Sequence, residues 1–360
     1  MKNDHLREWR KTENFTCPQC EDFVHLKVGD IVIPHFSHKK DAACSASFSE
    51  GESKEHLEGK RQLYQFFQRI DKKVRLEPYF KALAQRPDLL VTDHQEKVPI
   101  EFQCSTISIS QIESRTKGYE SAGMKPVWLL RTPGKLKTLP PGVGVFQFSQ
   151  FERSFITNQI PEGLVFLTYD PEFERFHYFS SLVHVTGKQH IGIHRTLSSS
   201  RQLFPFARPK SPTLIELQEY VLLFLSIRKK FLQSRISVNR RGINDSFLRG
   251  CYELRILPGE LPLWIGVPVA FMSSFSEHVC EWQLALVYYM KERRLKVKDL
   301  TVGAIRNFIK RFQGPTEMQV KACLDYRDFL LFVDVDSLNN VVKISERKLV
   351  EKIADTILAK

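Results

Sequence analysis

The sequence contains no long apolar run. Its most apolar stretches, LYQFF, YVLLFLSI and LALVYYM, are short and interrupted, whereas a membrane-spanning helix needs about 20 predominantly apolar residues. The N-terminal stretch MKNDHLREWRKTEN is charged and lacks the apolar core of a secretory signal. We therefore expect a cytoplasmic protein without a membrane span.

Acidic residues are scarce relative to basic ones. The 41 Asp and Glu residues face 53 Lys and Arg, which gives a formal net charge of +12. Such an excess favours a polyanionic partner, either nucleic acid or an acidic membrane surface. At 360 residues the chain is long enough for two or three domains with apolar cores.

Cysteine is also sparse. There are seven, an odd number in a chain without a secretory signal, which indicates reduced thiols or metal ligands rather than a disulfide framework. Cys17, Cys20 and Cys44 lie with His35 and His38 in the first 50 residues. This segment has too little apolar periodicity to fold on a core of its own, so it needs a cross-link of another kind.

The spacing of this cluster predicts a structural zinc site. The two-residue spacer of CPQC allows Cys17 and Cys20 to reach one tetrahedral ion, and a second pair of ligands further along completes such a site. We expect that pair to be Cys44 and His38, since His38 lies nearer to Cys44 than His35 does. A chance CxxC is the alternative. A redox CxxC is disfavoured because it neither follows a predicted strand nor opens a helix.

Apolar periodicity in the next part predicts a small α/β core with a mixed sheet. The expected order is helix, three strands, helix and strand, over residues 53–70, 73–80, 86–92, 97–103, 108–122 and 126–131. Four further short strands, VGVFQF, GLVFLTYD, FERFHYF and SLVHVTG, are expected to extend this core in antiparallel fashion.

The remainder of the chain is expected to be helical. The stretch RTLSSSRQLFPFARPKSP is the best linker candidate, and four helix candidates follow it: TLIELQEYVLLFLSIRKKFLQ, EWQLALVYYMKERR, TVGAIRNFIKRF and ISERKLVEKIADTILAK. The sequence thus predicts three domains: a zinc-binding segment at residues 1–50, an α/β domain at 51–200 and a basic, mainly helical domain at 210–360.

Carboxylates gather around the fragments RPDLL and PIEFQCS. Asp88 opens one predicted strand, while Glu101 and Gln103 share one face of the next because they are two residues apart. Oxygen ligands of this kind suit Mg²⁺ or Mn²⁺, especially when phosphate supplies the remaining ligands. The chemistry that fits is metal-assisted phosphodiester hydrolysis. Glu77 on the preceding strand is a weaker candidate, because an exposed strand acid is the simpler interpretation.

These residues carry a family resemblance. Asp88, then twelve residues, then Glu101-Phe102-Gln103 resembles the PD-(D/E)XK nuclease core. The fuller string GESKEHLEGK, RPDLL and PIEFQCSTIS, with the later Arg115 and Tyr119, is similar to the competence protein CoiA family over about residues 15–200. The resemblance implies a nuclease-like fold and a role in natural transformation, on incoming DNA around the recombination stage.

The resemblance also implies roles for single residues. Asp88 and Glu101 would be the metal carboxylates, with a first-helix glutamate, Glu55 or Glu52, facing the metal; a solvated helix start is the alternative for these two. Gln103 stands where the superfamily usually has lysine, so it brings no positive charge to the attacking water.

Two residues of the first predicted helix offer what Gln103 lacks. Lys60 would supply the missing positive charge, and His56, one turn earlier on the same stripe, would act as a general base. An ordinary surface histidine is the alternative for His56.

Candidate DNA contacts fall into two groups. Arg115 and Tyr119 resemble the Q-x-x-x-Y helix of exonuclease-like members, although a structural Arg and a packed Tyr explain them equally well. A basic cluster without intervening acids provides the second group, Arg228, Lys229, Lys230, Arg240 and Arg241. Such clusters give salt-sensitive binding that tolerates any sequence, although a solvated helix face is the ordinary alternative.

The leading hypothesis is a Mg²⁺- or Mn²⁺-dependent deoxyribonuclease that acts on DNA, in single-stranded or branched form, during transformation and recombination. The main alternative is a non-catalytic DNA-binding recombination mediator on a degenerate nuclease fold, with Gln103 marking the lost activity. A protein-interaction scaffold is a third alternative. The transformation context suggests a strand-exchange recombinase as protein partner.

Overall fold

The computed structural model describes residues 3–17, 20–29, 34–39, 53–159, 163–237, 244–335 and 345–357. The chain divides into two compact units. Unit 1 comprises Met1–Pro133, Thr168–Phe176 and Ser198–Phe206, and unit 2 comprises Gly134–Leu167, His177–Leu197 and Ala207–Lys360. The expected domain boundaries at residues 50, 200 and 210 stay a prediction.

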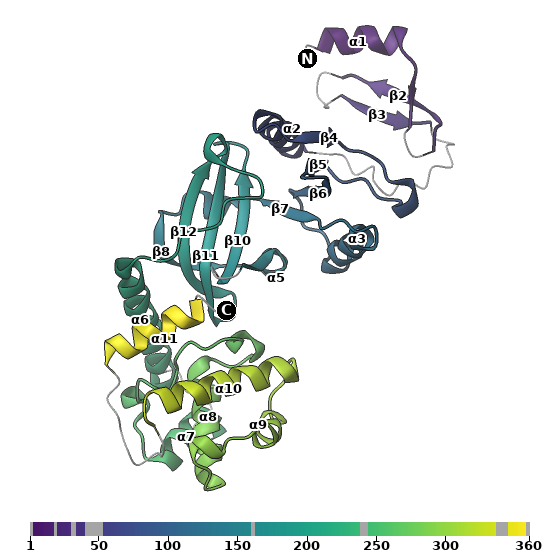
Figure 1. Ribbon diagram of the computed structural model, residues 1–360. Helices are drawn as coiled ribbons and strands as arrows, with labels where there is room; N and C mark the ends of the chain where they lie inside the picture. Colours follow the sequence, from purple (N-terminus) through teal and green to yellow (C-terminus); the bar gives the residue numbers. More distant parts are fainter. Residues whose placement is uncertain are drawn as a thin grey trace. The chain divides into compact units, whose positions relative to one another are not determined.

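The N-terminal segment forms a helix and a small antiparallel sheet with strand order β1-β2-β3 (Figure 1). Its elements are α1 (Asn3–Thr12), β1 (Phe15–Thr16), β2 (Phe23–Lys27) and β3 (His35–His38). Among the residues of this segment that the structure describes, only Cys17, Leu26 and Val28 are buried. So small a core needs additional cross-linking.

The core of unit 1 is a mixed sheet. Its elements are α2 (Lys54–Arg69), β4 (Lys73–Leu76), β5 (Leu89–Asp93), β6 (Glu96–Gln103), α3 (Ile109–Ser121) and β7 (Val127–Arg131). The strand order is β4-β5-β6-β7, antiparallel from β4 to β6 and parallel between β6 and β7. Beyond β7, the end of β10 (Gly163–Asp170) pairs in parallel, with Thr168 beside Leu130.

The two helices of this core cover opposite faces of the sheet. Phe102 of β6 meets Gly59 of α2 so closely that a Cβ on Gly59 would overlap its ring, whereas the adjacent Glu101 contacts Tyr119 of α3. Since successive strand residues point to opposite faces, α2 lies on one face and α3 on the other. Local sequence sets where both helices begin, because the hydroxyls of Ser53 and Ser108 cap them.

Unit 2 combines antiparallel strands with helices. Its strands are β8 (Gly142–Gln147), β9 (Ile156–Gln159), most of β10 and β11 (Arg175–Thr186), and β12 (Gln189–Ser198). Its helices are α4 (Gly134–Lys137), α5 (Gln150–Arg153), α6 (Leu214–Ser237), α7 (Ser246–Leu254), α8 (Val279–Glu292), α9 (Val302–Ile309), α10 (Thr316–Phe332) and α11 (Glu346–Ile357). One apolar core joins α6 to α11 with Val183, Val185 and Ile191 of β11 and β12.

Short 3-10 turns complete the described elements. They are η1 (Lys81–Leu83), η2 (Ser199–Arg201), η4 (Pro258–Glu260), η5 (Met272–Ser274) and η6 (Val297–Asp299). In the part of the chain that the structure describes, none of the helices has the length and apolar content that spanning a bilayer requires.

The expected fold class is confirmed: a mixed α/β sheet, an N-terminal sheet with cysteine and histidine ligands, and a mainly helical C-terminal region. Five of the described helices were not predicted, namely the longer α1, α7 and α10 and the four-residue α4 and α5. The stretches FERFHYF and SLVHVTG were expected as two strands but form the single strand β11. The predicted linker begins inside β12.

Candidate functional site

A pocket of about 780 Å³ opens at one edge of the unit 1 sheet. Asp88 immediately precedes β5, and Gln103 ends β6, which is antiparallel to β5 and parallel to β7. The start of β5 and the ends of β6 and β7 therefore meet at this edge. The pocket is lined by, among others, Glu55, His56, Glu77, Arg86, Asp88, Glu101, Gln103, Cys104, Arg115 and Arg131.

Asp88 is held from both sides. Its Oδ2 accepts the backbone N–H of Phe102 at 2.8 Å, while its Oδ1 lies 3.3 Å from Nε2 of His56 and 3.8 Å from Nζ of Lys60. Burial would raise the pKa of this carboxyl, but His56, Lys60 and the backbone N–H outweigh it, so the pKa of Asp88 is lowered. Asp88 is thus kept ionised.

Lys60 is buried, with a relative exposure of 2%. Its ammonium pairs with Glu77 of the loop after β4 as well as lying near Asp88. A buried lysine requires anionic partners, and these two carboxylates supply them. Lys60 and His56 therefore reach the predicted carboxylate from α2, where the sequence placed them.

Glu101 behaves differently from Asp88. Its Oε1 accepts hydrogen bonds from Tyr119 at 2.5 Å and from the guanidinium of Arg115. Burial nevertheless raises the pKa of Glu101 to about 7, and the charge of Asp88 adds to this rise. Arg115 and Tyr119 oppose it but do not cancel it. The two neighbouring carboxylates are therefore not equally ready to ionise.

Gln103 and Glu55 also line the pocket. The amide of Gln103 donates to the carbonyl oxygen of Ser105 at 2.7 Å. Glu55 is exposed in the first turn of α2, and hydrogen bonds from its own backbone N–H and from Ser53 lower its pKa. Both residues thus face the same space as Asp88 and Glu101.

The donor set fits a divalent cation that uses few protein ligands. Asp88, Glu101 and Glu55 line one pocket, but their carboxylate oxygens do not all lie within 4.8 Å of one another. Among the described residues, the group of three that meets this distance is Cys17, Cys20 and His38. Mg²⁺ is commonly held by one or two carboxylates, with water and substrate phosphate completing the shell. Burial, with the charge of Asp88 adding to it, raises the pKa of Glu101 and so disfavours its ionised form. A bound cation would favour that ionised form.

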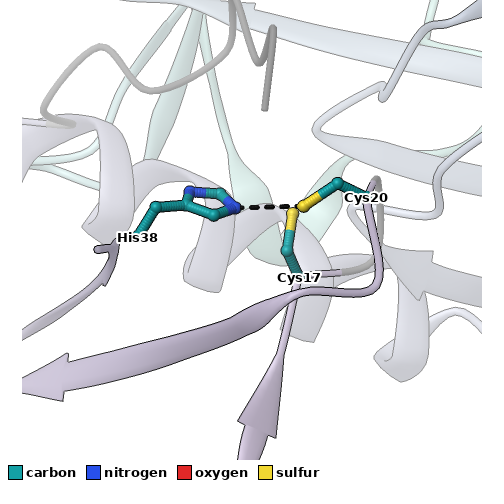
Figure 2. A group of neighbouring side chains, drawn as sticks. All are labelled: Cys17, Cys20 and His38. Atoms are coloured by element: carbon teal, nitrogen blue, oxygen red, sulfur yellow. Dashed lines mark hydrogen bonds between the residues drawn. The ribbon is translucent and has the colours of Figure 1, made fainter. Parts of the chain in front are cut away.

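The second metal-binding candidate is the N-terminal cluster. Cys17, Cys20 and His38 place one ligand atom each within 4.8 Å of one another, and Nε2 of His38 lies 3.3 Å from Sγ of Cys20 (Figure 2). Tetrahedral zinc with these ligands separates the atoms by about 3.5–3.8 Å. The cluster therefore fits a structural zinc. His38 rather than His35 joins it, and Cys44 lies outside the described residues.

The structure corrects two expected DNA contacts. Arg228 is 7% exposed, and its guanidinium donates to the backbone carbonyls of Leu261, Pro262 and Ile265, so it serves the interior of unit 2. Tyr119 is fully buried against Glu101. The expectation that these two residues contact DNA is wrong, because neither side chain is accessible.

The other expected contacts have mixed outcomes. Lys229 and Lys230 are exposed on α6, and Arg240 and Arg241 lie outside the described residues. Arg115 lines the pocket but is paired with Glu101 and also donates to the carbonyl of Arg86. Its position orients Glu101, which a helix motif alone does not reveal.

Sequence reasoning missed two pocket residues, Arg86 and Arg131. Arg86 pairs with Glu77 through Nη1 at 3.2 Å. Glu77, a weaker candidate in the sequence, therefore also lies at this site. Arg131 ends β7. A signal existed for both: Arg86 directly precedes the Pro-Asp pair, and Arg131 closes the strand parallel to the one that carries Glu101.

Comparisons with known proteins identify the domains of this chain. Residues 52–211 match the model of the competence protein CoiA nuclease-like domain, and residues 1–47 match that of the CoiA N-terminal domain. The Competence protein CoiA of Bacillus subtilis (strain 168) is 29% identical over 337 residues, covering 89% of this chain and 86% of that protein. No solved structure matches the chain.

The mixed α/β sheet and the matched domain model define a nuclease-like protein, with an N-terminal segment whose Cys17, Cys20 and His38 could hold a metal ion. Both matched models describe domains of competence protein CoiA and together they cover residues 1–47 and 52–211, so the chain belongs to the competence protein CoiA family.

Proposed function

We propose that this protein is a Mg²⁺- or Mn²⁺-dependent deoxyribonuclease that acts on DNA during natural transformation and recombination, in the cytoplasm. The observation that carries the proposal is the meeting of Asp88, Glu101 and His56 in one pocket, with the buried ammonium of Lys60 3.8 Å from Oδ1 of Asp88. The similarity to a Competence protein CoiA of Bacillus subtilis supports the biological context.

Each side chain has a role that its contacts support. Asp88, Glu101 and Glu55 would hold the divalent ion, since all three line the pocket. When bound, that ion supplies a more acidic water and neutralises the charge that builds on the phosphate. His56 lies near Asp88 at the pocket and is placed to accept a proton from the attacking water.

Lys60 compensates for the missing lysine of the superfamily motif. Gln103 offers an amide but no charge, whereas Lys60 brings an ammonium to 3.8 Å from Oδ1 of Asp88. The positive charge thus reaches the carboxylate from α2 instead of β6. Gln103 remains suited to orient water by hydrogen bonding.

The direct test is a cleavage assay on single-stranded, duplex and branched DNA with Mg²⁺ or Mn²⁺. We expect the parent protein to cleave at least one of these and Asp88→Ala or Glu101→Ala to lose the activity by at least about 100-fold, since each removes a metal ligand. Asp93→Ala provides a control, because Asp93 lies at the other end of β5 and pairs with Lys72. Cleavage by both active-site variants at the parent rate would exclude this pocket as the source.

A second candidate function is non-catalytic DNA binding by a recombination mediator. Gln103 favours it, as does the pairing of Glu101 with Arg115 and Tyr119, which competes with metal binding. A parent protein that binds DNA in a salt-dependent manner but cleaves no DNA form with either metal would support this alternative. Exposed Lys229 and Lys230 remain proposed phosphate contacts in both cases.

The N-terminal cluster is proposed to hold structural zinc through Cys17, Cys20, His38 and Cys44. We expect about one zinc ion per purified chain and its loss in Cys17→Ser, because the remaining ligands no longer complete a tetrahedron. Cys104→Ser is the matched control, since Cys104 lies in the pocket of the α/β core. Equal zinc content in Cys17→Ser and the parent would contradict the assignment.

A further inference from the structure

Three arginines line the pocket, and two of them already have carboxylate partners. Arg115 pairs with Glu101, and Arg86 pairs with Glu77. The third, Arg131, makes no ion pair or side-chain hydrogen bond with any residue in the described part of the chain. Its charge is therefore available to an anion that enters the pocket.

The strand register places Arg131 at the edge of the sheet where the pocket opens. Leu130 pairs with Gln103 in the parallel β6–β7 ladder, so Arg131 follows at the level of Cys104. Its influence on nearby groups agrees with this position. The pKa of Cys104 rises to about 12, mainly because of burial, and the positive charge of Arg131 is the largest opposing effect.

Besides the hydrogen bonds from its own backbone N–H and from Ser53, the charge of Arg131 contributes to the lowered pKa of Glu55 without an ion pair between the two side chains, and the surroundings of Arg131 suit a phosphate. Arg131 is partly exposed, so its guanidinium retains donors that can face the pocket. The first turn of α2 lines the same pocket through Ser53, Glu55 and His56, and the N-terminus of a helix favours anions. A guanidinium holds phosphate oxygens in a bidentate manner that an ammonium does not reproduce.

We propose that Arg131 binds an internal phosphate of the DNA strand in this pocket and thereby sets the position of the strand relative to Asp88 and Glu101. This inference rests on the proposed nuclease function for its substrate class. It assigns the phosphate contact to β7, whereas the sequence had suggested α3. Arg115 then acts on Glu101, and Arg131 acts on the substrate.

The test measures binding separately from cleavage. Full-length parent, Arg131→Ala and Arg131→Lys are titrated with a fluorescent single-stranded oligonucleotide without added Mg²⁺ or Mn²⁺, at several salt concentrations. We expect Arg131→Ala to bind more weakly and to lower the slope of log K against log[salt] by about 0.7, the value for one phosphate contact on a single strand. Arg131→Lys should keep the slope but bind more weakly than the parent.

Arg75→Ala is the matched control, because Arg75 is exposed on β4 and does not line the pocket. It removes the same charge and should leave the slope unchanged. Melting temperatures of all variants are compared with that of the parent. Arg131→Gln replaces Arg131→Ala if the latter fails to fold, since Gln also lacks the charge.

The outcomes separate this inference from the proposed function. A parent that cleaves DNA, together with an unchanged slope and affinity in Arg131→Ala, overturns the inference alone. A parent that binds but does not cleave, with the slope lowered in Arg131→Ala, overturns the catalytic proposal alone. An effect that appears only with a 5′-phosphorylated oligonucleotide overturns the internal contact in favour of a terminal phosphate. A parent that binds no oligonucleotide overturns the inference, and one that in addition cleaves no DNA form with either metal overturns both.

Discussion

Asp88 and Glu101 are adjacent carboxylates with opposite pKa shifts. The pKa of Asp88 is lowered, against its burial, by His56 and Lys60, while burial raises the pKa of Glu101 to about 7. The spacing of the sequence identifies both residues. It does not reveal the difference between them, because the groups that decide it come from α2 on one face and α3 on the other.

The shift at Glu101 predicts how Glu101→Gln changes stability with pH. The folded-state pKa, about 7, lies above the value of about 4.3 expected in the unfolded chain. The folded state therefore binds the proton more tightly, and the stability contributed by this proton is present below about pH 4.3 and lost as the pH rises to 7. Gln removes this loss while keeping an acceptor for Tyr119 and Arg115.

We expect the melting temperature of Glu101→Gln, without added divalent cation, to increase relative to that of the parent as the pH is raised from 5 to 8. Glu96→Gln is the control, because Glu96 is exposed at the start of β6, and its difference from the parent should stay constant. A difference for Glu101→Gln that is flat or falls over this pH range would contradict the assigned shift.

At the scale of elements, the helix at residues 53–70 and the strands around the pocket were predictable because capping and periodicity agree there. The structure gives α2 as Lys54–Arg69 with Ser53 as its cap. Helix α1 was missed because it is strongly polar and has only Leu6 and Trp9 as large apolar residues. Strand β11 was divided in the prediction because Ser180 and Ser181 look like a turn, whereas both are buried in a continuous strand.

The close approach of α2 to β6 depends on Gly59. A Cβ at this position would overlap the ring of Phe102, which is buried and packs against Tyr169, so the ring has little room to move. We expect Gly59→Ala to lower the free energy of unfolding by about 1–3 kcal/mol. Because the displaced helix carries His56 and Lys60, DNA cleavage should decrease as well.

Gly303→Ala is the matched helical control. Gly303 lies in α9, and a Cβ added there would meet only the hydroxyl of Thr301, at 3.9 Å. Alanine is the better helix former, so this change should be neutral or stabilise by up to about 1 kcal/mol. Chemical denaturation of both variants provides the comparison. A Gly59→Ala variant as stable and active as the parent would show that α2 can shift without consequence.

At the scale of the whole molecule, the net charge of +12 predicted a polyanionic partner but not which basic residues are available to it. Arg228 looks like a member of a surface cluster, yet it is buried and hydrogen-bonded to backbone carbonyls, while its neighbours Lys229 and Lys230 are exposed. Which face of α6 a residue occupies decides whether its side chain is buried or exposed, and a count of charges contains no such information.

In unit 2, His278 makes stability depend on pH in the opposite direction to Glu101 of the pocket. Burial, with the charge of Arg228 adding to it, lowers the pKa of His278 to about 3. His278 caps α8 by accepting the N–H of Cys280 at 3.2 Å, and its ring stacks on Phe231. Because the folded-state pKa lies below the unfolded value of about 6.5, the stability that this neutral histidine contributes is present above pH 6.5 and lost as the pH falls toward 3.

The change His278→Asn tests this directly. Asn is a good N-cap that does not titrate, so the variant should lose stability at pH 7 through the missing stacking, yet its free energy of unfolding should decline less steeply than that of the parent between pH 6.5 and 4. We expect the slope of the free energy of unfolding against pH to be smaller in the variant by up to about 1.4 kcal/mol per pH unit, the value for one proton. His94→Asn, at a position with 91% side-chain exposure, should leave the slope unchanged. Parallel pH profiles for His278→Asn and the parent would mean that His278 takes up its proton without unfolding, and that the acid sensitivity of unit 2 lies elsewhere.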